Sequence, residues 1–304
     1  MGAQLSKNRF TSPKLQSVRE NVRSASIQQV LRFVKQTDCP SCFIFHIRWF
    51  PLSKTDLKAE LYRDKDEGYS SNIRWEIIQL IPAGNHKILE VGCGAGHTLK
   101  KLKELSKANE TVGIEINEQV TQGLSDTLDR LYVGDVETID LPHTENCFDY
   151  IIFGDVLEHL IDPRRVLHSY KSLLRDDGYI IASIPNIKHY SVLLRLIFFD
   201  EFQYSDAGIL DRSHLRFFTK KEILKMFTDE KFEVVDLIPL DGSKPGEKKY
   251  KDTLFTFLNS KLFPLLSRLQ ILTLYFVDSS FYASQYIIKA KKTKSEDAAM
   301  TTHL

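Results

Sequence analysis

Three glycines at alternate positions stand where a short apolar run ends and a helical stretch begins. They are Gly92, Gly94 and Gly96, with Glu90 just ahead of them. Glycine lets the backbone turn sharply and approach a ligand closely. The start of the following helix offers N–H groups and the positive end of its dipole. The run therefore indicates a loop that wraps around part of a bound small molecule.

Acidic side chains follow the next apolar runs of the chain. Glu115 ends the second run, Asp135 follows the third and Asp155 follows the fourth. An acid at the end of the second strand can accept hydrogen bonds from ribose hydroxyls, and Asp135 suits an adenine amino group. A dinucleotide fingerprint needs a small residue where this chain has His97, and the loop has no Lys or Arg to meet a pyrophosphate. The acids therefore favour a neutral or cationic nucleoside.

The elements that must position these residues are apolar runs alternating with amphipathic stretches from about residue 87 onward. Such alternation predicts βαβ units and a parallel sheet, and parallel sheets bind ligands at the carboxyl ends of their strands. The glycine loop and the three acids should therefore meet in one crevice. The expected strands are 87–91, 111–115, 131–133, 148–153, 179–184, 232–237 and 284–290, and the expected helices are 98–105, 119–128, 164–174 and 220–227.

At this point the sequence resembles the class I S-adenosylmethionine-dependent methyltransferases of the small-molecule branch, which includes ubiquinone-type and saccharide-biosynthesis O-methyltransferases. The resemblance covers about residues 69–239 and the last expected strand. Relatives usually have Pro-Gly-Gly before the fifth strand where this chain has Asp176-Asp177-Gly178, which concerns the turn geometry and not cofactor binding. The matching stretches are 88–96 for the first motif, 112–115 for the second, 148–160 for the fourth strand, 174–186 for the fifth, and 214–219.

The resemblance implies a Rossmann-like α/β fold, with a seven-stranded, mostly parallel sheet, helices on both faces and an antiparallel last strand. It also implies S-adenosyl-L-methionine as the cofactor. The methionine part would lie against Glu90 and Gly92, and Asp155 would lie near the methionine amine and the methyl donor. The remaining cofactor contacts that it implies are Gly94 and Gly96 for the loop, Glu115 and Ile116 for the ribose, and Asp135 and Val136 for the adenine.

Methyl transfer from a sulfonium needs an aligned acceptor and a group that takes the acceptor's proton. The candidates are His159, just after the fourth strand, and His214, between the fifth strand and the next helix. The alternative for each is a structural histidine bonded to the backbone.

Some relatives hold a divalent ion through an acidic-x-x-Glu-His run, which corresponds here to Asp155, Glu158 and His159. Three such ligands on one turn can bind Mg²⁺ or Zn²⁺ weakly. Many relatives with Leu-Glu-His need no metal, so the expected site has none and a metal stays the alternative.

The acceptor is expected to be a small molecule, a saccharide or a lipid-linked compound, and O-methylation is the expected reaction. No nucleic-acid substrate is expected. The fourth strand is followed by Gly154-Asp155, whereas enzymes that methylate amino groups of nucleic acids have an Asn/Asp-Pro-Pro-Tyr run there. The aromatic-rich stretch 187–218 is predicted to be a lid. A second apolar stretch, 255–274, is interpreted as a helix packed on the sheet or as an interfacial surface for a lipid-linked acceptor.

The two ends of the chain are basic, although the net charge of the 304 residues is only +1. Residues 1–37 carry seven Lys or Arg and one Glu, and residues 244–304 carry ten basic and five acidic residues. Residues 38–243, between the two basic ends, therefore carry a net negative charge. Basic ends indicate a docking function at an anionic surface, separate from catalysis. A cytoplasmic protein with peripheral membrane contact is expected.

Short motifs in the N-terminal region leave alternatives open. The start of the chain fits an N-myristoylation pattern at Gly2 and Ser6, and its acid-poor, Arg-rich character fits a mitochondrial transit peptide. A solvated basic tail followed by an amphipathic helix is the favoured interpretation. The pair Cys39 and Cys42 lacks a second pair to complete a zinc site.

The predicted organisation is a basic extension with an amphipathic helix (1–68), a methyltransferase domain (69–290) and a polar tail (291–304). Inserts are expected at about 187–218 and 241–280. A hydrophobic content of 42% excludes a wholly disordered chain. Two other classes remain: a non-catalytic cofactor-binding protein on this fold, whose loop should be broken, and a membrane-surface adaptor.

Overall fold

A computed structural model describes residues 72–121, 124, 127–141, 146–240 and 279–293. The predicted N-terminal extension, including Cys39 and Cys42, lies outside these residues. So do nearly all of the second predicted insert and most of the C-terminal tail. The predicted boundaries 1–68, 69–290 and 291–304 stay predictions.

Seven strands form one sheet in the order β3-β2-β1-β4-β5-β7-β6. The pairs among β1 to β5 are parallel, whereas β7 is antiparallel to both of its neighbours. This confirms the predicted Rossmann-like fold with an antiparallel last strand. The strands are β1 (Lys87–Val91), β2 (Glu110–Glu115), β3 (Arg130–Val133), β4 (Phe148–Gly154), β5 (Leu174–Pro185), β6 (Phe232–Leu240) and β7 (Gln285–Lys292).

Helices cover both faces of the sheet because successive strand residues point to opposite sides. Along β1, Leu89 and Val91 join the core with helices α8 (Pro163–Lys171) and α10 (Lys220–Asp229). Ile88 joins the opposite core with α6 (Trp75–Gln79) and α7 (His97–Glu104). A sheet buried on both faces explains why its central strands read as continuous apolar runs.

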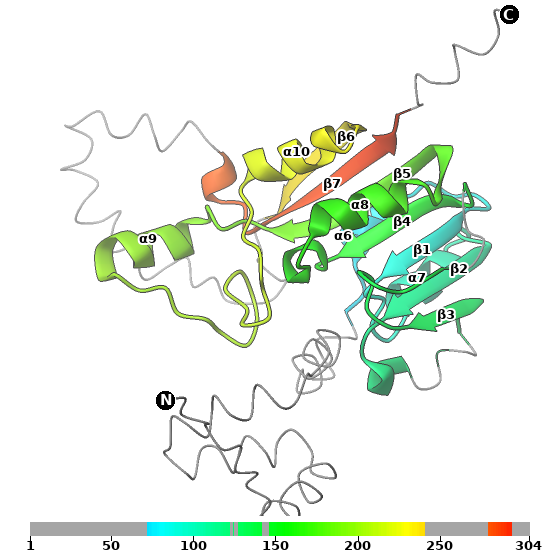
Figure 1. The fold of residues 1–304 in the computed structure, drawn as a ribbon, viewed down its shortest axis with the longest axis horizontal. Coiled ribbons are helices and arrows are strands. Elements are labelled where there is room, and N and C mark those ends of the chain that lie inside the picture. The colour runs from blue at the N-terminus through cyan, green and yellow to red at the C-terminus, as the bar shows by residue number, and fades with distance from the viewer. Residues whose placement is uncertain (1–71, 122–123, 125–126, 142–145, 241–278, 294–304) are drawn as a thin grey trace, which may run out of the picture. The chain divides into compact units, whose positions relative to one another are not determined.

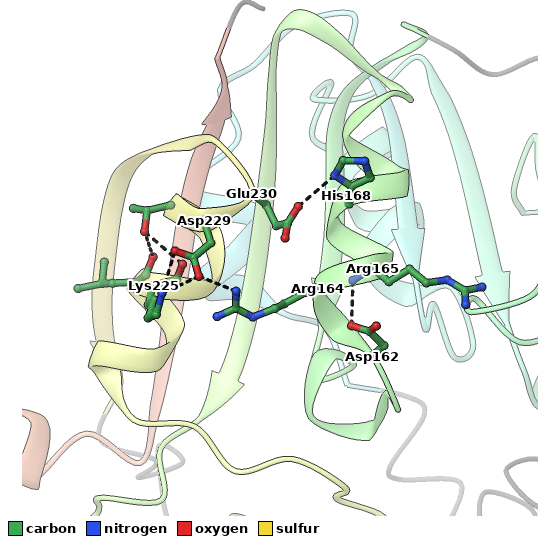
Figure 2. A network of polar contacts seen from close by, with 9 residues as sticks. Asp162, Arg164, Arg165, His168, Lys225, Asp229 and Glu230 are labelled. Carbon is green, nitrogen blue, oxygen red and sulfur yellow. Dashed lines mark hydrogen bonds and ion pairs between the residues drawn. The ribbon is translucent and has the colours of Figure 1, made fainter.

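Helices α8 and α10 begin at clear capping signals and meet through a polar network on the surface. Asp162 accepts a hydrogen bond from the backbone N–H of Arg165, with Pro163 at the first helical position. Figure 2 shows Asp229 of α10 between the side chains of Arg164 and Lys225, at 2.5 and 2.8 Å. The neighbouring pair is His168 Nδ1 and Glu230 Oε2, 3.1 Å apart. We name these five polar side chains, Arg164, His168, Lys225, Asp229 and Glu230, the α8–α10 network.

Most elements differ from their sequence-based bounds by one to three residues, and two others differ in kind or by more than three residues. Within the predicted helix 119–128 the described residues include the 3₁₀ turn Glu118–Thr121, where the β-branched Val120 and Thr121 disfavour an α-helix. Strand β5 begins at Leu174 and not at residue 179, and its register against β4 shifts between Phe148 and Tyr150. The stretch Asp176-Asp177-Gly178 lies within this irregular part of the strand.

The predicted lid contains helix α9 (Tyr190–Phe199), which projects away from the sheet in Figure 1. Its C-terminal half exposes large apolar side chains: 69% of Ile197, 66% of Phe198 and 60% of Phe199 are accessible. Among the described residues, no helix has the length and apolar character to cross a membrane.

Candidate functional site

The turn after β1 needs glycine at two positions that line a cavity. Gly92 and Gly94 have φ of 68° and 51°, in the left-handed region that favours glycine. A Cβ on Gly92 would lie 2.6 Å from Cγ2 of Val156, in the turn after β4. The backbone is therefore shaped to bring the β1 and β4 turns close together.

Gly96, predicted to shape the loop, lies at the start of α7. It is the left-handed residue before the first turn of α7, with φ of 69°, and it does not line the cavity. A Cβ there would lie 3.1 Å from Leu124. Gly96 therefore shapes the loop by starting the helix and packing, and not by contact with the cavity.

Glu115, at the end of β2, holds the glycine loop in place. One carboxylate oxygen accepts a hydrogen bond from the backbone N–H of Gly94 at 2.8 Å, and the other accepts one from Asn117 N–H at 2.9 Å. Burial raises the pKa of Glu115, while the backbone donors oppose this rise. Each carboxylate oxygen has a further lone pair that can accept a ribose hydroxyl.

Glu90 is 1% exposed and lines the same cavity. Its Oε2 atom is buried and has no hydrogen-bond partner among the described residues. Burial raises the pKa of Glu90 from its ordinary value of 4.5 to about 8, with Arg74 lowering it and Glu115 raising it further. A cation in the cavity would supply the missing partner for the charged form.

Asp155 follows β4 in a strained left-handed conformation, with φ of 53°. Its carboxylate accepts hydrogen bonds from Arg74, from Gln285, and from Ser183 Oγ at 2.8 Å. Sequence reasoning missed Arg74 and Gln285, and it placed Ser183 in the fifth-strand motif without assigning it a contact. No local motif marks Arg74 and Gln285, because they lie 81 and 130 positions from Asp155.

Most of the residues predicted to bind the cofactor line one cavity at the carboxyl ends of β1, β2, β3 and β4. Asp135, buried beyond β3, accepts a hydrogen bond from Glu137 N–H at 3.0 Å. Arg74 enters from the residue before α6. Of the predicted site residues, those lining this cavity are Glu90, Gly92, Gly94, Glu115, Ile116, Asp135, Val136, Asp155 and His159, whereas Gly96 and His214 do not.

His159 and His214, predicted separately, lie together with Glu158 in a buried group that we name the Glu-His-His cluster. The ring centroids of the two histidines are 4.6 Å apart. His214 Nε2 lies 3.9 Å from Glu158 Oε1. The segment carrying His214 is held by the N–H groups of Leu215 and Arg216, which both donate to the Glu158 carbonyl at 2.9 Å.

The Glu-His-His cluster is almost fully shielded from water. Glu158 is 1% exposed, and neither of its side-chain oxygens has a hydrogen-bond partner among the described residues. Burial raises the pKa of Glu158 well above its ordinary value, and the Asp155 charge adds to this. Burial, and then His214, lower the pKa of His159 to about 4. At neutral pH His159 is therefore a neutral imidazole at the wall of the cavity.

The two histidines also have the backbone contacts expected of structural histidines. His159 Nδ1 lies 3.1 Å from the carbonyl of Ser213, and His214 Nδ1 lies 3.0 Å from the carbonyl of Ile209. A carbonyl only accepts, so each Nδ1 carries the proton and each Nε2 carries the lone pair. The two interpretations offered by the sequence are therefore compatible, because the bonds orient the rings and leave Nε2 as the basic atom.

Comparisons with known proteins show the family to which the chain belongs. Residues 56–237 match a family described as a methyltransferase domain. A ubiquinone biosynthesis O-methyltransferase of Psychrobacter cryohalolentis is 26% identical over 193 residues, covering 60% of this chain and 72% of the relative. An uncharacterized methyltransferase, YcgJ of Bacillus subtilis, is 24% identical over 195 residues, covering 62% and 72%.

A solved structure supports the fold at low sequence identity. It is a complex between the Trm112 methyltransferase activator of Haloferax volcanii and a methyltransferase. The match has a TM-score of 0.52 and 14% identity, and covers 80% of this chain and 99% of the other.

The cavity fits S-adenosyl-L-methionine. Its acidic lining and the orphaned Glu90 oxygen suit a sulfonium and an ammonium group, and Arg74 offers a partner for a carboxylate. The glycine turns give backbone room beside the acids. With the domain match over more than half of its length, the chain belongs to the class I S-adenosylmethionine-dependent methyltransferases.

Proposed function

We propose that this methyltransferase acts on an oxygen of a small, saccharide, quinone-like or lipid-linked acceptor. The observation that carries the proposal is the Glu-His-His cluster at the edge of the cofactor cavity. It places a neutral imidazole, His159, in the cavity wall with a carboxyl group and a second imidazole behind it. The O-methyltransferase names among the relatives support an oxygen acceptor.

S-adenosylmethionine supplies an activated methyl group, so the protein's own contribution is alignment and proton removal. We propose that Glu90 and Asp155 face the cationic methionine end, that Glu115 and Ile116 contact the ribose, and that Asp135 and Val136 flank the adenine. Gly92 and Gly94 then keep the loop close to the cofactor. The acceptor oxygen approaches His159, and its proton leaves towards the Glu-His-His cluster.

The test is a labelled-methyl transfer assay against cell extracts fractionated into lipids, glycans, small molecules and proteins. Label should enter an alkali-stable ether in the lipid, glycan or small-molecule fraction. A matched Gly92→Val variant, which cannot adopt the turn without meeting Val156, should bind no cofactor and transfer nothing. Label confined to the protein fraction would refute the proposed acceptor class. Absence of cofactor binding by the wild-type chain would favour a membrane-surface adaptor instead.

We also propose peripheral contact with membranes through the apolar end of α9. Ile197, Phe198 and Phe199 are exposed together on a helix that projects from the sheet, and amphipathic aromatic surfaces of this kind insert into the lipid interface. The basic ends of the sequence would add attraction to anionic lipids.

Sedimentation with phosphatidylcholine vesicles, with and without phosphatidylserine, tests this contact. Replacing Ile197 and Phe198 by Ser should release the protein from both kinds of vesicle while cofactor binding persists. Removal of residues 1–37 should weaken binding only to the anionic vesicles. Binding that survives both changes would exclude α9 and the N-terminal region as the docking elements.

A further inference from the structure

The three members of the Glu-His-His cluster come from two separate parts of the chain and converge on one point. Glu158 and His159 lie in the 3₁₀ turn after β4, and His214 lies in the segment before α10. Each offers one ligand atom, and the three atoms lie within 4.8 Å of one another. Metal–ligand bonds of about 2.0–2.2 Å place neighbouring ligand atoms roughly 3 Å apart. A modest inward movement of the side chains therefore brings all three to one ion.

The backbone contacts of the two imidazoles resemble those of metal-ligating histidines. Ligating histidines usually donate their second ring N–H to a carbonyl or carboxylate, which fixes the ring and its tautomer. Here the carbonyls of Ser213 and Ile209 receive the two Nδ1–H groups. The turn carrying Ser213 is held in turn by Asp211, whose Oδ1 accepts the Ser213 N–H at 2.9 Å.

Glu158 supplies an independent sign of a ligand. Its side chain is 1% exposed, and neither oxygen has a hydrogen-bond partner among the described residues. Burying a carboxyl group in this way is costly unless a partner satisfies it. The nearby Asp155 does not take that place as a co-ligand, since Arg74, Ser183 and Gln285 already hold its carboxylate. This differs from the set Asp155, Glu158 and His159 suggested by the sequence.

We propose that Glu158, His159 and His214 form a binding site for one first-row divalent transition metal ion of the Zn²⁺ class. Two imidazoles and one carboxylate suit Zn²⁺, Fe²⁺, Co²⁺ or Mn²⁺, whereas Mg²⁺ and Ca²⁺ prefer sites built of oxygen. Three protein ligands leave a coordination position open, as in catalytic zinc sites. His159 lines the cofactor cavity, so an ion held by the three residues would be next to the cofactor. When bound, the ion would lower the pKa of a coordinated acceptor hydroxyl, whose proton would then leave to bulk water, so this inference rests on the proposed function and changes only how the proton is removed.

Metal content decides the proposal without any measurement of methyl transfer. The full chain carrying Cys39→Ser and Cys42→Ser lacks the thiol pair that could also bind Zn²⁺. It is stripped with a chelator, dialysed against excess Zn²⁺ and then freed of unbound metal by gel filtration. We expect one Zn²⁺ per chain by elemental mass spectrometry. Glu158→Gln and His214→Gln should each weaken binding at least about tenfold. His168→Gln, at a surface His–Glu pair of similar composition, should leave it unchanged.

Calorimetry with S-adenosylmethionine shows which variants are folded, and Glu158→Gln is close in shape to the native residue. If Zn²⁺ binds equally well to folded Glu158→Gln and His214→Gln, or binds the parent chain at less than one equivalent, the site is refuted. A parent chain that binds Zn²⁺ at this site and methylates no acceptor would retain the metal site and refute only the proposed reaction.

Discussion

Two groups of titratable residues in this protein are arranged in opposite ways. The α8–α10 network lies on the surface, and Asp229 is paired with both Arg164 and Lys225 (Figure 2). The Glu-His-His cluster lies in the interior, and the carboxyl group of Glu158 has no hydrogen-bond partner among the described residues. The α8–α10 network therefore pairs its side chains at the surface, where water could also solvate them. The Glu-His-His cluster leaves a carboxyl group in the interior, where this costs most, without a hydrogen bond from the part of the chain that the structure describes.

The difference indicates which group is kept for stability and which for function. Paired surface charges contribute little individually and tolerate replacement. A buried carboxyl group without a partner lowers stability, and functional sites commonly carry such a cost. The shifted pKa values follow the same division: burial raises that of Glu158, whereas Lys225 and Arg164 lower that of Asp229.

The largest expected effect separates the two groups by activity. His159→Gln should lower the methyl-transfer rate by about 100-fold or more, because a residue that assists proton removal contributes about that factor. Asp229→Asn should change the rate by no more than about twofold, as expected for a surface substitution. Single-turnover assays with the acceptor identified by extract fractionation measure both rates. Equal losses in the two variants would remove the functional distinction.

A second prediction extends the comparison to Glu90 and concerns pH. The pKa of Glu90 is raised from 4.5 to about 8, chiefly by burial. Its contribution to stability is therefore complete below pH 4.5 and is lost as the pH rises to about 8, because the unfolded chain ionises first. The pKa of Asp229 is lowered, so its contribution is present above its ordinary pKa and is lost as the pH falls through the folded value.

Urea unfolding of the cofactor-free protein should therefore show stability falling by up to a few kcal/mol between pH 4.5 and 8. Glu90→Gln should flatten this slope, and Asp229→Asn should not. Saturating S-adenosylmethionine should also flatten it, because a cation favours the charged form of Glu90. A slope that is the same in Glu90→Gln would show that another group is responsible.

The parts of the site that sequence reasoning predicted are those encoded locally. The turn from Glu90 to Gly96 combines an apolar run, alternate glycines and a helix start within a few residues, so its conformation and place are both readable. The acids Glu115, Asp135 and Asp155 were placed correctly at one sheet edge, because parallel strands put their carboxyl ends together. Gly96 belongs to the same loop, and the structure places it at the start of α7 and not in the cavity lining.

The rest depends on contacts between distant parts of the chain. Arg74 and Gln285 reach Asp155 only after the sheet has formed. His214 reaches Glu158 because the backbone of Leu215 and Arg216 docks on the Glu158 carbonyl, and no spacing rule encodes that contact. Periodicity predicts a helix over 119–128, and the described residues there include the 3₁₀ turn Glu118–Thr121, where β-branched residues have low intrinsic helix propensity.

A third prediction measures the cost of the buried carboxyl group directly. Glu158→Met replaces it with an unbranched apolar side chain of similar length. In the metal-free and cofactor-free protein, this change should raise the free energy of unfolding by about 1–3 kcal/mol, because an unsatisfied buried polar group is removed. Zn²⁺ should stabilise the parent protein and leave the variant unchanged. A loss of stability in Glu158→Met would show that the native carboxyl group is already satisfied in the folded protein.

The smallest effect is expected in the α8–α10 network. Asp229→Ala removes the partner of both Arg164 and Lys225, and all three groups are exposed enough for water to replace the lost contacts. The thermal midpoint should fall by about 2 °C at most, and the change should shrink further in high salt because surface ion pairs are screened. Differential scanning calorimetry at low and high salt gives both values. The contradicting outcome is a salt-independent destabilisation by Asp229→Ala that matches the stabilisation by Glu158→Met in size. The α8–α10 contact would then hold the helix layer together. The division between a stabilising surface and a functional interior would not apply to this face of the sheet.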